Sequence, residues 1–333
     1  MNVTGVADLS VDVAILGSPD LPAIVISSGV HGVEGPFGAA VQLAWMDAQR
    51  GQPVNARFVL IHALNPYGYA LGRRVNEDNI DLNRNFLGDG DGDGELIVAD
   101  VQCNVPRNRD YARFDALLNP KAPPKRIDLF LIQALAYLAR EGKQRLQSAI
   151  VTGQYEFAQG LFYGGDGPSV SVNIVQNNIT RWIGRAPAVC HLDFHTGLGR
   201  FGQCQLLVQV LPDSTEYAWY CNTFSEYELV PTETNNTKAY QANGAMGNWL
   251  TQCFGDRPYR FLTAEFGTYS ALKMLASLRA ENQAFHHSPF DSEVRARERL
   301  RLERCFCPPS PRWRCAVVEK GLTLIQQATF NIV

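Results

Sequence analysis

The sequence predicts an α/β fold in one domain over residues 1–333, with a mixed central sheet between two helical layers, a three-layer α/β/α architecture. Short apolar runs that are typical of strands are spread from residue 9 to residue 265, and segments with helical periodicity alternate with them. No internal repeat, heptad run or low-complexity tract interrupts this alternation. With 333 residues, of which 46% are apolar, the chain is long enough to bury one large core.

The first strand–turn–helix unit begins close to the start of the chain. Residues 9–16 alternate apolar and polar side chains as a strand does, and the apolar run 23–26 predicts a buried strand that ends in a tight turn. Pro36 suits the first position of a helix, and Gly51 marks its end. We expect the buried stripe of this helix to consist of Phe37, Ala40, Val41, Ala44 and Trp45.

The same patterns predict the later elements. Strands are expected at 57–63, 188–195, 205–211 and 260–265. The strand at 57–63 ends in the turn signal Asn65-Pro66-Tyr67-Gly68. Helical spacing of apolar residues, as in Leu131, Leu135 and Leu138, predicts one long amphipathic helix over 127–150 with a break near Gly142. Further helices are expected at 214–224, 244–254, 271–285, 292–304 and 316–329.

Charge and composition exclude several classes of partner. The net charge is −3 and both signs are scattered, so the chain lacks the electrostatic footprint of a protein that binds nucleic acid or an anionic membrane. The arginine-rich run 295–304 also contains glutamates and is interpreted as a solvated helix face. The sequence has neither a signal-peptide pattern nor eighteen consecutive apolar residues, so we expect a cytoplasmic protein. Its eight cysteines are interpreted mainly as buried reduced thiols, and the oligomeric state stays open.

Two strand ends carry side chains that metal ions prefer. His31 and Glu34 follow the strand at 23–26 and lie about one helical turn apart, so both can face one point as zinc ligands. His195 closes the strand at 188–195, and Asp193 on the same face is placed to orient a ligating imidazole. A loop histidine, a surface glutamate and a core histidine are the alternative, but the three together favour a metal site.

Two further polar features have more than one interpretation. Glu265 ends the strand at 260–265 and is either a paired structural acid or a general base beside the metal. The segment 73–86 is dense in guanidinium and amide groups, and is either a surface loop or a site wall that offers donors to a carboxylate or an oxyanion. His286 and His287 follow a helix in a polar context and are left out of the site.

Two loops resemble ligand-binding templates only in part. Residues 89–100 place acidic side chains as in a calcium loop, but Asp100 replaces the usual final glutamate and no helix precedes the loop, so a flexible acidic insertion is favoured over calcium. The glycine-rich segment 163–169 lacks the Gly-Lys-Ser/Thr pattern of a phosphate cradle and is interpreted as a pocket rim.

The ordered motifs resemble a known superfamily. His-x-x-Glu, Asn-Pro-x-Gly, the arginine and asparagine segment, a histidine at a strand end and a late glutamate at a strand end resemble the zinc carboxypeptidases, the M14 peptidases. The variants at 31–34 and 193–196 look closer to the succinylglutamate desuccinylase and aspartoacylase branch. The stretches 62–68, 73–86, 160–165 and 195–199 look like the DUF2817 group.

The resemblance implies a carboxypeptidase-like (phosphorylase/hydrolase-like) fold and a zinc ion bound by His31, Glu34 and His195. Glu265 would be the general base, and Arg74, or less plausibly Arg73, would polarise the scissile carbonyl. Asn83 and Arg84 would hold a substrate carboxylate. The family also uses a mobile tyrosine over the scissile bond, for which the candidates are Tyr163, Tyr240 and Tyr269.

The expected activity is hydrolysis of an amide bond next to a carboxylate. The substrate would be a peptide with a free carboxyl end or a small N-acyl amino acid, and the sequence does not choose between carboxypeptidase and deacylase. The alternative is a non-catalytic protein that keeps the fold and binds a metal or a ligand. Glu265 distinguishes the two, because a binding protein has no use for a base beside the metal.

Overall fold

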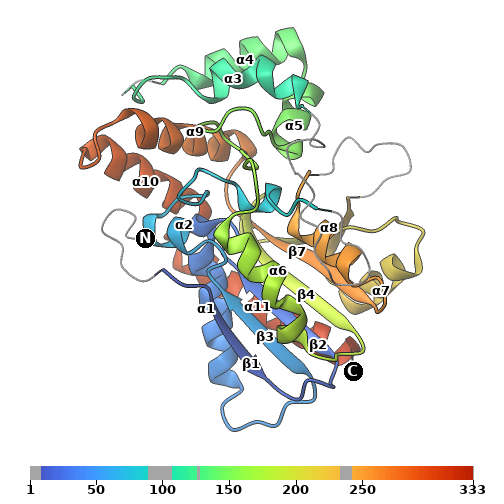
Figure 1. Cartoon of the computed structure of the whole chain (residues 1–333). Coiled ribbons are helices and arrows are strands. Elements are labelled where there is room, and N and C mark those ends of the chain that lie inside the picture. Colours follow the sequence, from blue (N-terminus) through green and yellow to red (C-terminus); the bar gives the residue numbers. More distant parts are fainter. Residues whose placement is uncertain (1–8, 89–106, 126–127, 233–241, 333) are drawn as a thin grey trace.

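In the computed structural model, residues 9–88, 107–125, 128–232 and 242–332 are described, and seven strands among them form one mixed sheet (Figure 1). The strand order is β1-β3-β2-β4-β7-β5-β6. The strands are β1 (Asp12–Leu16), β2 (Ala23–Ser28), β3 (Arg57–His62), β4 (Val189–Gly197), β5 (Cys204–Val208), β6 (Glu228–Pro231) and β7 (Tyr259–Gly267).

The parallel centre of the sheet explains its continuous apolar runs. β3, β2, β4 and β7 are parallel to one another, whereas β1 runs antiparallel to β3 and β5 antiparallel to β7. Every residue of β2 and β4 is buried, as expected for parallel strands that helices cover on both faces. The predicted mixed sheet is therefore confirmed. Only β6, a four-residue strand beside β5, lacks a counterpart among the predicted strands.

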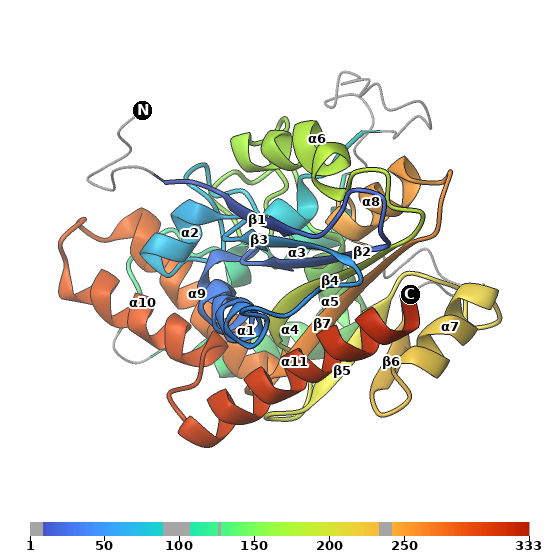
Figure 2. The ribbon, with the colours of Figure 1, turned by 90° about the horizontal axis from the view of Figure 1, so that it is seen from below.

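Helices cover both faces of the sheet (Figure 2), which confirms the three-layer architecture. One face packs against α1 (Gly35–Ala48), α7 (Thr215–Thr223) and α11 (Pro311–Ile332). The other face packs against α6 (Val170–Ile183) and α8 (Met246–Cys253). The assignment of residues 1–333 to a single domain stays a prediction.

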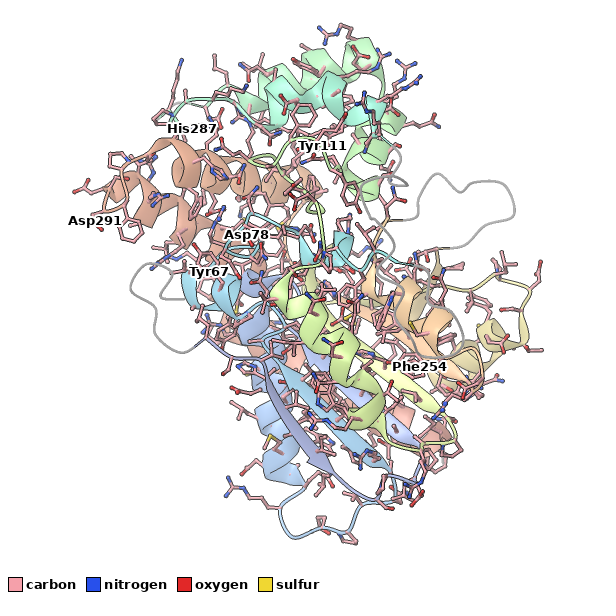
Figure 3. The ribbon with its side chains drawn as sticks, viewed as in Figure 1. Tyr67, Asp78, Tyr111, Phe254, His287 and Asp291 are labelled. Carbon is pink, nitrogen blue, oxygen red and sulfur yellow. The ribbon has the colours of Figure 1, made fainter. Side chains whose placement is uncertain are left out.

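A third apolar cluster lies beyond the carboxyl ends of the central strands. Here α3, α4 and α5 pack against α9 and α10, above the sheet in Figure 1. Tyr111, labelled in Figure 3, joins α3 to a neighbouring loop, because its hydroxyl donates to the carbonyl oxygen of Leu161 at 2.6 Å. The helix bounds are α3 (Arg109–Leu118), α4 (Phe130–Glu141), α5 (Lys143–Thr152), α9 (Ala271–His287) and α10 (Glu293–Phe306).

The buried stripe of α1 differs from the predicted one. Phe37, Val41 and Trp45 are buried, but Ala40 is exposed and Ala44 half-buried. Gly38 takes part in the contact instead, because a Cβ there would lie 2.3 Å from the Cβ of Ser28 on β2. The helix therefore lies closest to the sheet at a glycine. A prediction that looks only for apolar side chains does not identify such a contact.

The helix predicted over 127–150 is confirmed as two helices that are broken at Gly142, as expected, but two of the three leucines that indicated it are exposed. Gly142, at a φ of 87°, separates α4 from α5. Leu131 and Leu135 are 52% and 65% exposed, whereas Phe130 and Ala134 form the buried face of α4. The short helix α2 (Pro66–Leu71), α3 and α6 were not predicted, whereas the later helices lie close to their predicted positions.

Other expectations concern the surface and the cysteines. Among the described helices, none is long and apolar enough to cross a membrane. Cys190 and Cys204 are buried thiols, as expected, and Cys305 is buried as well, whereas Cys221 and Cys253 are only half-buried. The acidic segment 89–100 lies outside the described residues, so the calcium alternative stays a prediction.

Candidate metal centre

The candidate site lies where β2 and β4 end. The two strands are parallel and in register from Ala23 opposite Val189 to Ser28 opposite Phe194, so their carboxyl ends reach the same edge of the sheet. After β2 the chain turns through Gly29, whose φ of 72° favours glycine. His31 and Glu34 follow at once, the latter in the 3₁₀ turn Gly32–Glu34 (η1).

A close backbone approach fixes this turn. A Cβ at Gly32 would lie 2.0 Å from the carbonyl carbon of Gly68 in α2, so only glycine fits. The amide of Gly32 donates to the carbonyl oxygen of Arg74 at 3.2 Å, and that of Val33 to the carbonyl oxygen of Arg73 at 2.8 Å. The turn that carries Glu34 is thereby attached to the start of the arginine and asparagine segment.

The three predicted ligands converge. Single ligand atoms of His31, Glu34 and His195 lie within 4.8 Å of one another, and all three side chains are buried. His31 Nδ1 is 2.8 Å from Glu34 Oε1, and His195 Nδ1 is 3.2 Å from Glu34 Oε2. Metal–ligand distances of about 2.0–2.1 Å would place tetrahedral ligand atoms about 3.3 Å apart, so the observed spacing is of the right size.

A carboxylate stands behind each imidazole. Asp81 Oδ1 lies 3.2 Å from His31 Nε2, and Asp193 Oδ2 lies 2.6 Å from His195 Nε2. A carboxylate at Nε2 favours the tautomer with a proton there and leaves the lone pair on Nδ1 free for a cation. Both Nδ1 atoms face Glu34, so the donor set fits a small divalent cation.

Asp193 was expected in this role from its alternation with His195 along the strand, but Asp81 was missed. Asp81 is fully buried, and its carboxylate also accepts hydrogen bonds from Arg74 Nε at 3.0 Å and from the amide of Asn83 at 3.1 Å. Burial opposes its ionisation, but Arg74 and His31 outweigh burial and hold the pKa of Asp81 well below its usual value. An acid beside Asn83 and Arg84 in a cation-rich segment was the available signal.

The charged groups of the cluster shift one another's pKa values. Burial opposes the charge on His195, but Asp193 and Glu34 outweigh it and raise the pKa of His195 well above its usual value. Burial likewise opposes the charge on Glu34, yet His31 and His195 lower the pKa of that carboxyl. The buried acids thus favour positive charge between them, which a bound cation would supply.

Glu265 lies beside the three ligands. It is opposite His195 in the parallel register of β4 and β7, and its Oε1 accepts from the amide of Leu198 at 2.8 Å. Burial, together with the negative charge of Glu34, raises the pKa of Glu265 to about 7. A carboxyl group with such a pKa can exchange a proton near neutral pH.

The two adjacent arginines point to different places. Arg74 Nη1 lies 3.5 Å from Glu34 Oε1, and Arg74 Nε contacts Asp81, so this guanidinium borders the cluster. Arg73 is buried away from it, where Nε donates to Glu281 on α9 at 2.8 Å and the guanidinium stacks on Phe285 at 3.4 Å. The expected substrate role of Arg73 is therefore not supported, because its charge is neutralised by an acid on α9.

Asn83 and Arg84 follow Asp81 in a second 3₁₀ turn, Leu82–Arg84 (η2). Asn83 Oδ1 accepts from the amide of Met246 at 3.0 Å, so its side chain fastens the turn to α8. Arg84 is buried; its Nη1 donates to the carbonyl oxygen of Asn83 at 2.8 Å, and its Nε has no hydrogen-bond partner among the described residues. Burial lowers the pKa of Arg84, although Asp81 opposes the effect.

The three candidate tyrosines, and the two histidines that were left out of the site, do not belong to the ligand cluster among the described residues. The backbone oxygen of Tyr163 accepts from the amide of Asp81 at 2.7 Å, while Lys273 Nζ lies 3.3 Å from the ring centroid of Tyr269. Tyr240 lies outside the described residues. His286 bonds to Asn79 at 3.2 Å, and His287 ends α9 (Figure 3), so neither joins the three ligands.

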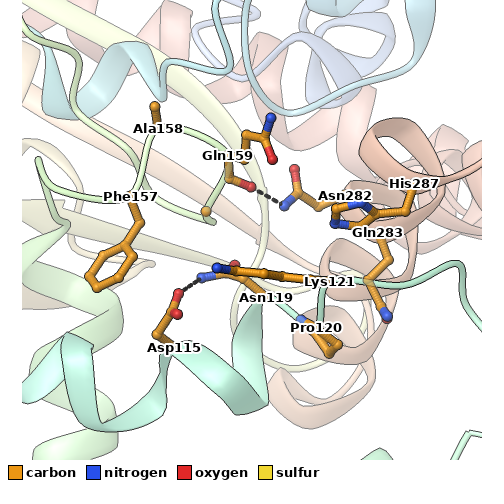
Figure 4. Close-up of a pocket in the computed structure, with 11 residues that line it drawn as sticks. Asp115, Asn119, Pro120, Lys121, Phe157, Ala158, Gln159, Asn282, Gln283 and His287 are labelled. Carbon is orange, nitrogen blue, oxygen red and sulfur yellow. Dashed lines mark hydrogen bonds between the residues drawn. The ribbon is translucent and has the colours of Figure 1, made fainter.

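A separate cavity of about 240 Å³ lies between the end of α3, the loop 157–160 and α9 (Figure 4). Hydrogen bonds brace its wall: Asn282 Nδ2 donates to the carbonyl oxygen of Gln159 at 2.8 Å, and Asn119 Nδ2 to Asp115 Oδ1 at 2.7 Å. The lining includes none of the three candidate ligands, so this cavity is distinct from the candidate metal centre.

Fold and site together define an α/β protein with a buried His/Glu/His centre at the carboxyl edge of its sheet. The chain belongs to the DUF2817 family, which is described as "Protein of unknown function (DUF2817)" and whose model matches residues 4–320. The match confirms the group that the motifs resemble. No curated protein matches the sequence.

Several solved structures resemble this chain at low sequence identity. Carboxypeptidase A from Helicoverpa armigera is 13% identical, with 87% of this chain and 69% of that chain covered and a TM-score of 0.44. Murein-tripeptide amidase from Escherichia coli O157 is 18% identical, with 82% and 84% covered and a TM-score of 0.37. An aspartoacylase family protein from Mesorhizobium loti is 13% identical, with 86% and 63% covered and a TM-score of 0.37.

Proposed function

We propose that the protein is a zinc-dependent hydrolase that cleaves an amide bond next to a carboxylate. The observation that carries this proposal is the convergence of His31, Glu34 and His195, whose ligand atoms lie within 4.8 Å of one another, with Glu265 beside them. Two imidazoles and one glutamate are the protein ligands of many catalytic zinc sites, in which the fourth position is open. A bound zinc ion would act as a Lewis acid that lowers the pKa of a water molecule and polarises the scissile carbonyl.

Glu265 has the properties of the general base. Its carboxylate would accept a proton from the attacking water and later deliver that proton to the nitrogen of the leaving amine. Without a metal, burial and the charge of Glu34 raise the pKa of Glu265 to about 7, and a zinc ion on Glu34 would lower this pKa and favour the ionised carboxylate that a base needs. The hydrogen bond from the amide of Leu198 fixes the orientation of the carboxylate.

Arg74 would stabilise the negative charge that develops on the carbonyl oxygen. Its guanidinium borders the ligand cluster, and Asp81 holds its Nε at 3.0 Å. Donors fixed in this way need little reorganisation when the charge develops. Asp81 thus serves two groups, since it orients both His31 and Arg74.

Arg84 and Asn83 would hold the carboxylate of the substrate. Support comes from the buried Nε of Arg84, a donor without a partner among the described residues. A guanidinium fork binds a carboxylate through two parallel hydrogen bonds. Both a peptide with a free carboxyl end and a small N-acyl amino acid present this group, so carboxypeptidase and deacylase both remain within the proposal.

A second candidate function is a non-catalytic protein that binds a metal or a ligand. Its support is the same triad, which would also suit metal storage or a structural ion. The position of Glu265 favours the hydrolase, because three protein ligands already hold the metal and the fourth acid lies beside them, where a base for a metal-bound water is needed.

Metal analysis combined with a substrate screen tests the proposal. The purified protein should hold about one equivalent of zinc, which His195→Ala should lose and His286→Ala should retain, since His286 lies outside the cluster. Hydrolysis should be found in a panel of N-acyl amino acids and peptides with free carboxyl ends, and a chelator should abolish it. Failure of the folded protein to bind zinc would refute the metal site, while full occupancy without turnover in either panel would favour the binding protein.

A further inference from the structure

A chain of buried polar side chains extends from His195 into the apolar layer beneath α6 and α8. After His195 Nε2 and Asp193 Oδ2, the next link is Ser27 on β2, whose hydroxyl donates to Asp193 Oδ1 at 2.6 Å. Ser27 Oγ lies 2.8 Å from His191 Nε2, and His191 Nδ1 lies 2.9 Å from the hydroxyl of Tyr259. The chain thus connects β2, β4 and the first residue of β7.

The proton positions along this chain follow from its geometry. Ser27 has one hydroxyl proton and gives it to Asp193, so its oxygen must accept from a proton on His191 Nε2. Burial lowers the pKa of His191 to about 4, so the ring is neutral at pH 7 and its Nδ1 accepts from the hydroxyl of Tyr259. Every hydrogen bond from Tyr259 to Asp193 therefore has the same direction.

Simple packing does not require these side chains. Ser27, His191 and Asp193 are at most 1% exposed, in a layer otherwise built from apolar residues of β2, β7, α6 and α8. The other face of β4 at the same level presents Cys190 and Leu192. Buried polar groups are costly unless every donor and acceptor is satisfied, and apolar residues would give a core of equal density without that constraint.

We propose that Ser27, His191 and Tyr259 are positioning residues, which form a proton-ordered relay that fixes Asp193 and thereby holds His195 with Nε2 protonated and Nδ1 turned toward the metal. With Oδ1 bound by Ser27, the carboxylate of Asp193 cannot rotate, and Oδ2 stays opposite His195 Nε2. The relay rests on the proposed function only in assigning a metal to His195. Its proton order is a property of the chain itself.

The proton order is tested directly by nitrogen NMR of the metal-free protein labelled at histidine nitrogens. The chain has six histidines, and the spectrum of His191→Gln identifies the signals of His191. We expect His191 to be neutral at pH 7 with its proton on Nε2. A proton on Nδ1, or a charged ring, would overturn the relay whether or not the protein binds zinc.

Zinc affinity, measured by competition with a chromophoric chelator, tests the positioning. Ser27→Ala should bind Zn²⁺ about tenfold more weakly than the wild type, at the low end of the effect of groups that orient metal ligands. Ser28→Ala is the matched control: Ser28 is equally buried on the same strand, but its hydroxyl lies 3.4 Å from Gln42 Oε1, and it should change the affinity less than twofold. Equal affinities of the two variants would overturn the positioning role.

A milder substitution at the far end covers the case in which Ser27→Ala does not fold. Tyr259→Phe keeps the ring, stacked on Phe254 at 5.0 Å, and removes only the hydroxyl. It should weaken Zn²⁺ binding about threefold. An unchanged affinity would mean that the hydroxyl of Tyr259 has no influence on His195, and it would refute the proposal. The outcomes separate the two proposals. If the relay variants bind zinc as tightly as the wild type, the relay alone is refuted. If the wild type binds no zinc, the metal site is refuted, and the NMR result still decides the proton order.

Discussion

The carboxyl edge of the sheet and the helical segment α3–α5 differ in which side chains they bury and which they expose. At the sheet edge, charged groups such as Glu34, Asp81 and Glu265 are buried, and each has a partner. In α3–α5, large apolar side chains are exposed although polar ones would suit solvent better. They are Leu129, Leu131, Ile132 and Leu135, each between 52% and 65% exposed.

The difference shows where sequence change should matter. At the sheet edge the strand register brings distant groups together, so a single substitution leaves a buried partner without its charge or hydrogen bond. The segment α3–α5 is held by one buried face, with Tyr111, Phe114 and Phe130 packed in the same cluster as α9. Substitutions on its outer face touch few neighbours, and their effects should be small.

The largest effect is expected from Glu265→Gln. The amide has the same shape but cannot accept a proton, so kcat should fall about thousandfold while zinc content stays unchanged. Single-turnover kinetics on the best substrate of the screen, together with metal analysis, measures both. Glu281→Gln is the control, because this buried acid pairs with Arg73 away from the ligands. Activity of Glu265→Gln within tenfold of the wild type would exclude Glu265 as the base.

The pH dependence of stability should reveal the same group without any substrate. Between pH 4.5 and pH 7, Glu265 is mostly protonated in the folded protein, where its pKa is about 7. In the unfolded protein, where its pKa is near 4.5, it is mostly ionised over the same range. Its contribution to stability is therefore full below pH 4.5 and is lost as the pH rises to 7. In metal-free protein, the free energy of unfolding of Glu265→Gln relative to wild type should rise by about 3 kcal/mol between pH 4.5 and pH 8.

Urea unfolding of both proteins at the two pH values, with a chelator present, measures this difference. Other titrating groups are common to the two proteins and largely cancel in the comparison. A difference that is independent of pH would mean that Glu265 titrates normally, and the burial argument for its raised pKa would then be wrong.

The next effect separates the two neighbouring arginines. Arg74→Ala removes a donor beside the ligands, so kcat should fall about a hundredfold. Its effect on folding should be smaller than that of Arg73→Ala, because Asp81 keeps its contacts with His31 and the amide of Asn83. Arg73→Ala instead leaves the buried Glu281 unpaired and should lower the free energy of unfolding by about 3 kcal/mol, with kcat of the folded fraction nearly unchanged. The contrast is lost if Arg73→Ala impairs turnover as strongly as Arg74→Ala.

These arginines also mark the limit of what the sequence predicts. His31, Glu34 and His195 could be grouped because strand ends in a parallel sheet share an edge, a rule that needs only the strand positions. Which of Arg73 and Arg74 faces the edge depends on the local backbone and on Glu281 of α9, which lies 208 residues after Arg73 in the sequence. No local pattern encodes that contact. The role of Asp81 was not predicted for the same reason, because its partner His31 lies 50 residues away in the sequence.

The helices were predicted well where a capping residue and an apolar stripe coincide. Ser292, the first residue of the helix predicted over 292–304, caps α10, and Ser270 caps α9. In α4 the stripe of leucines was visible, but apolar periodicity cannot say which of two apolar sides meets the rest of the protein. Packing on Phe130 and Ala134 decided which side is buried, so Leu131 and Leu135 are exposed and Leu138 is partly buried.

The smallest effect is therefore expected on the outer face of α4. Leu135→Ala should change the free energy of unfolding by less than about 0.5 kcal/mol, because its side chain is already 65% exposed and alanine favours the helix. Phe114→Ala, on the buried face of the same helical segment, should cost about 3–5 kcal/mol. Urea unfolding measures both. A cost above 2 kcal/mol for Leu135→Ala would show that this face is covered in solution, and the contrast between the two regions would no longer hold.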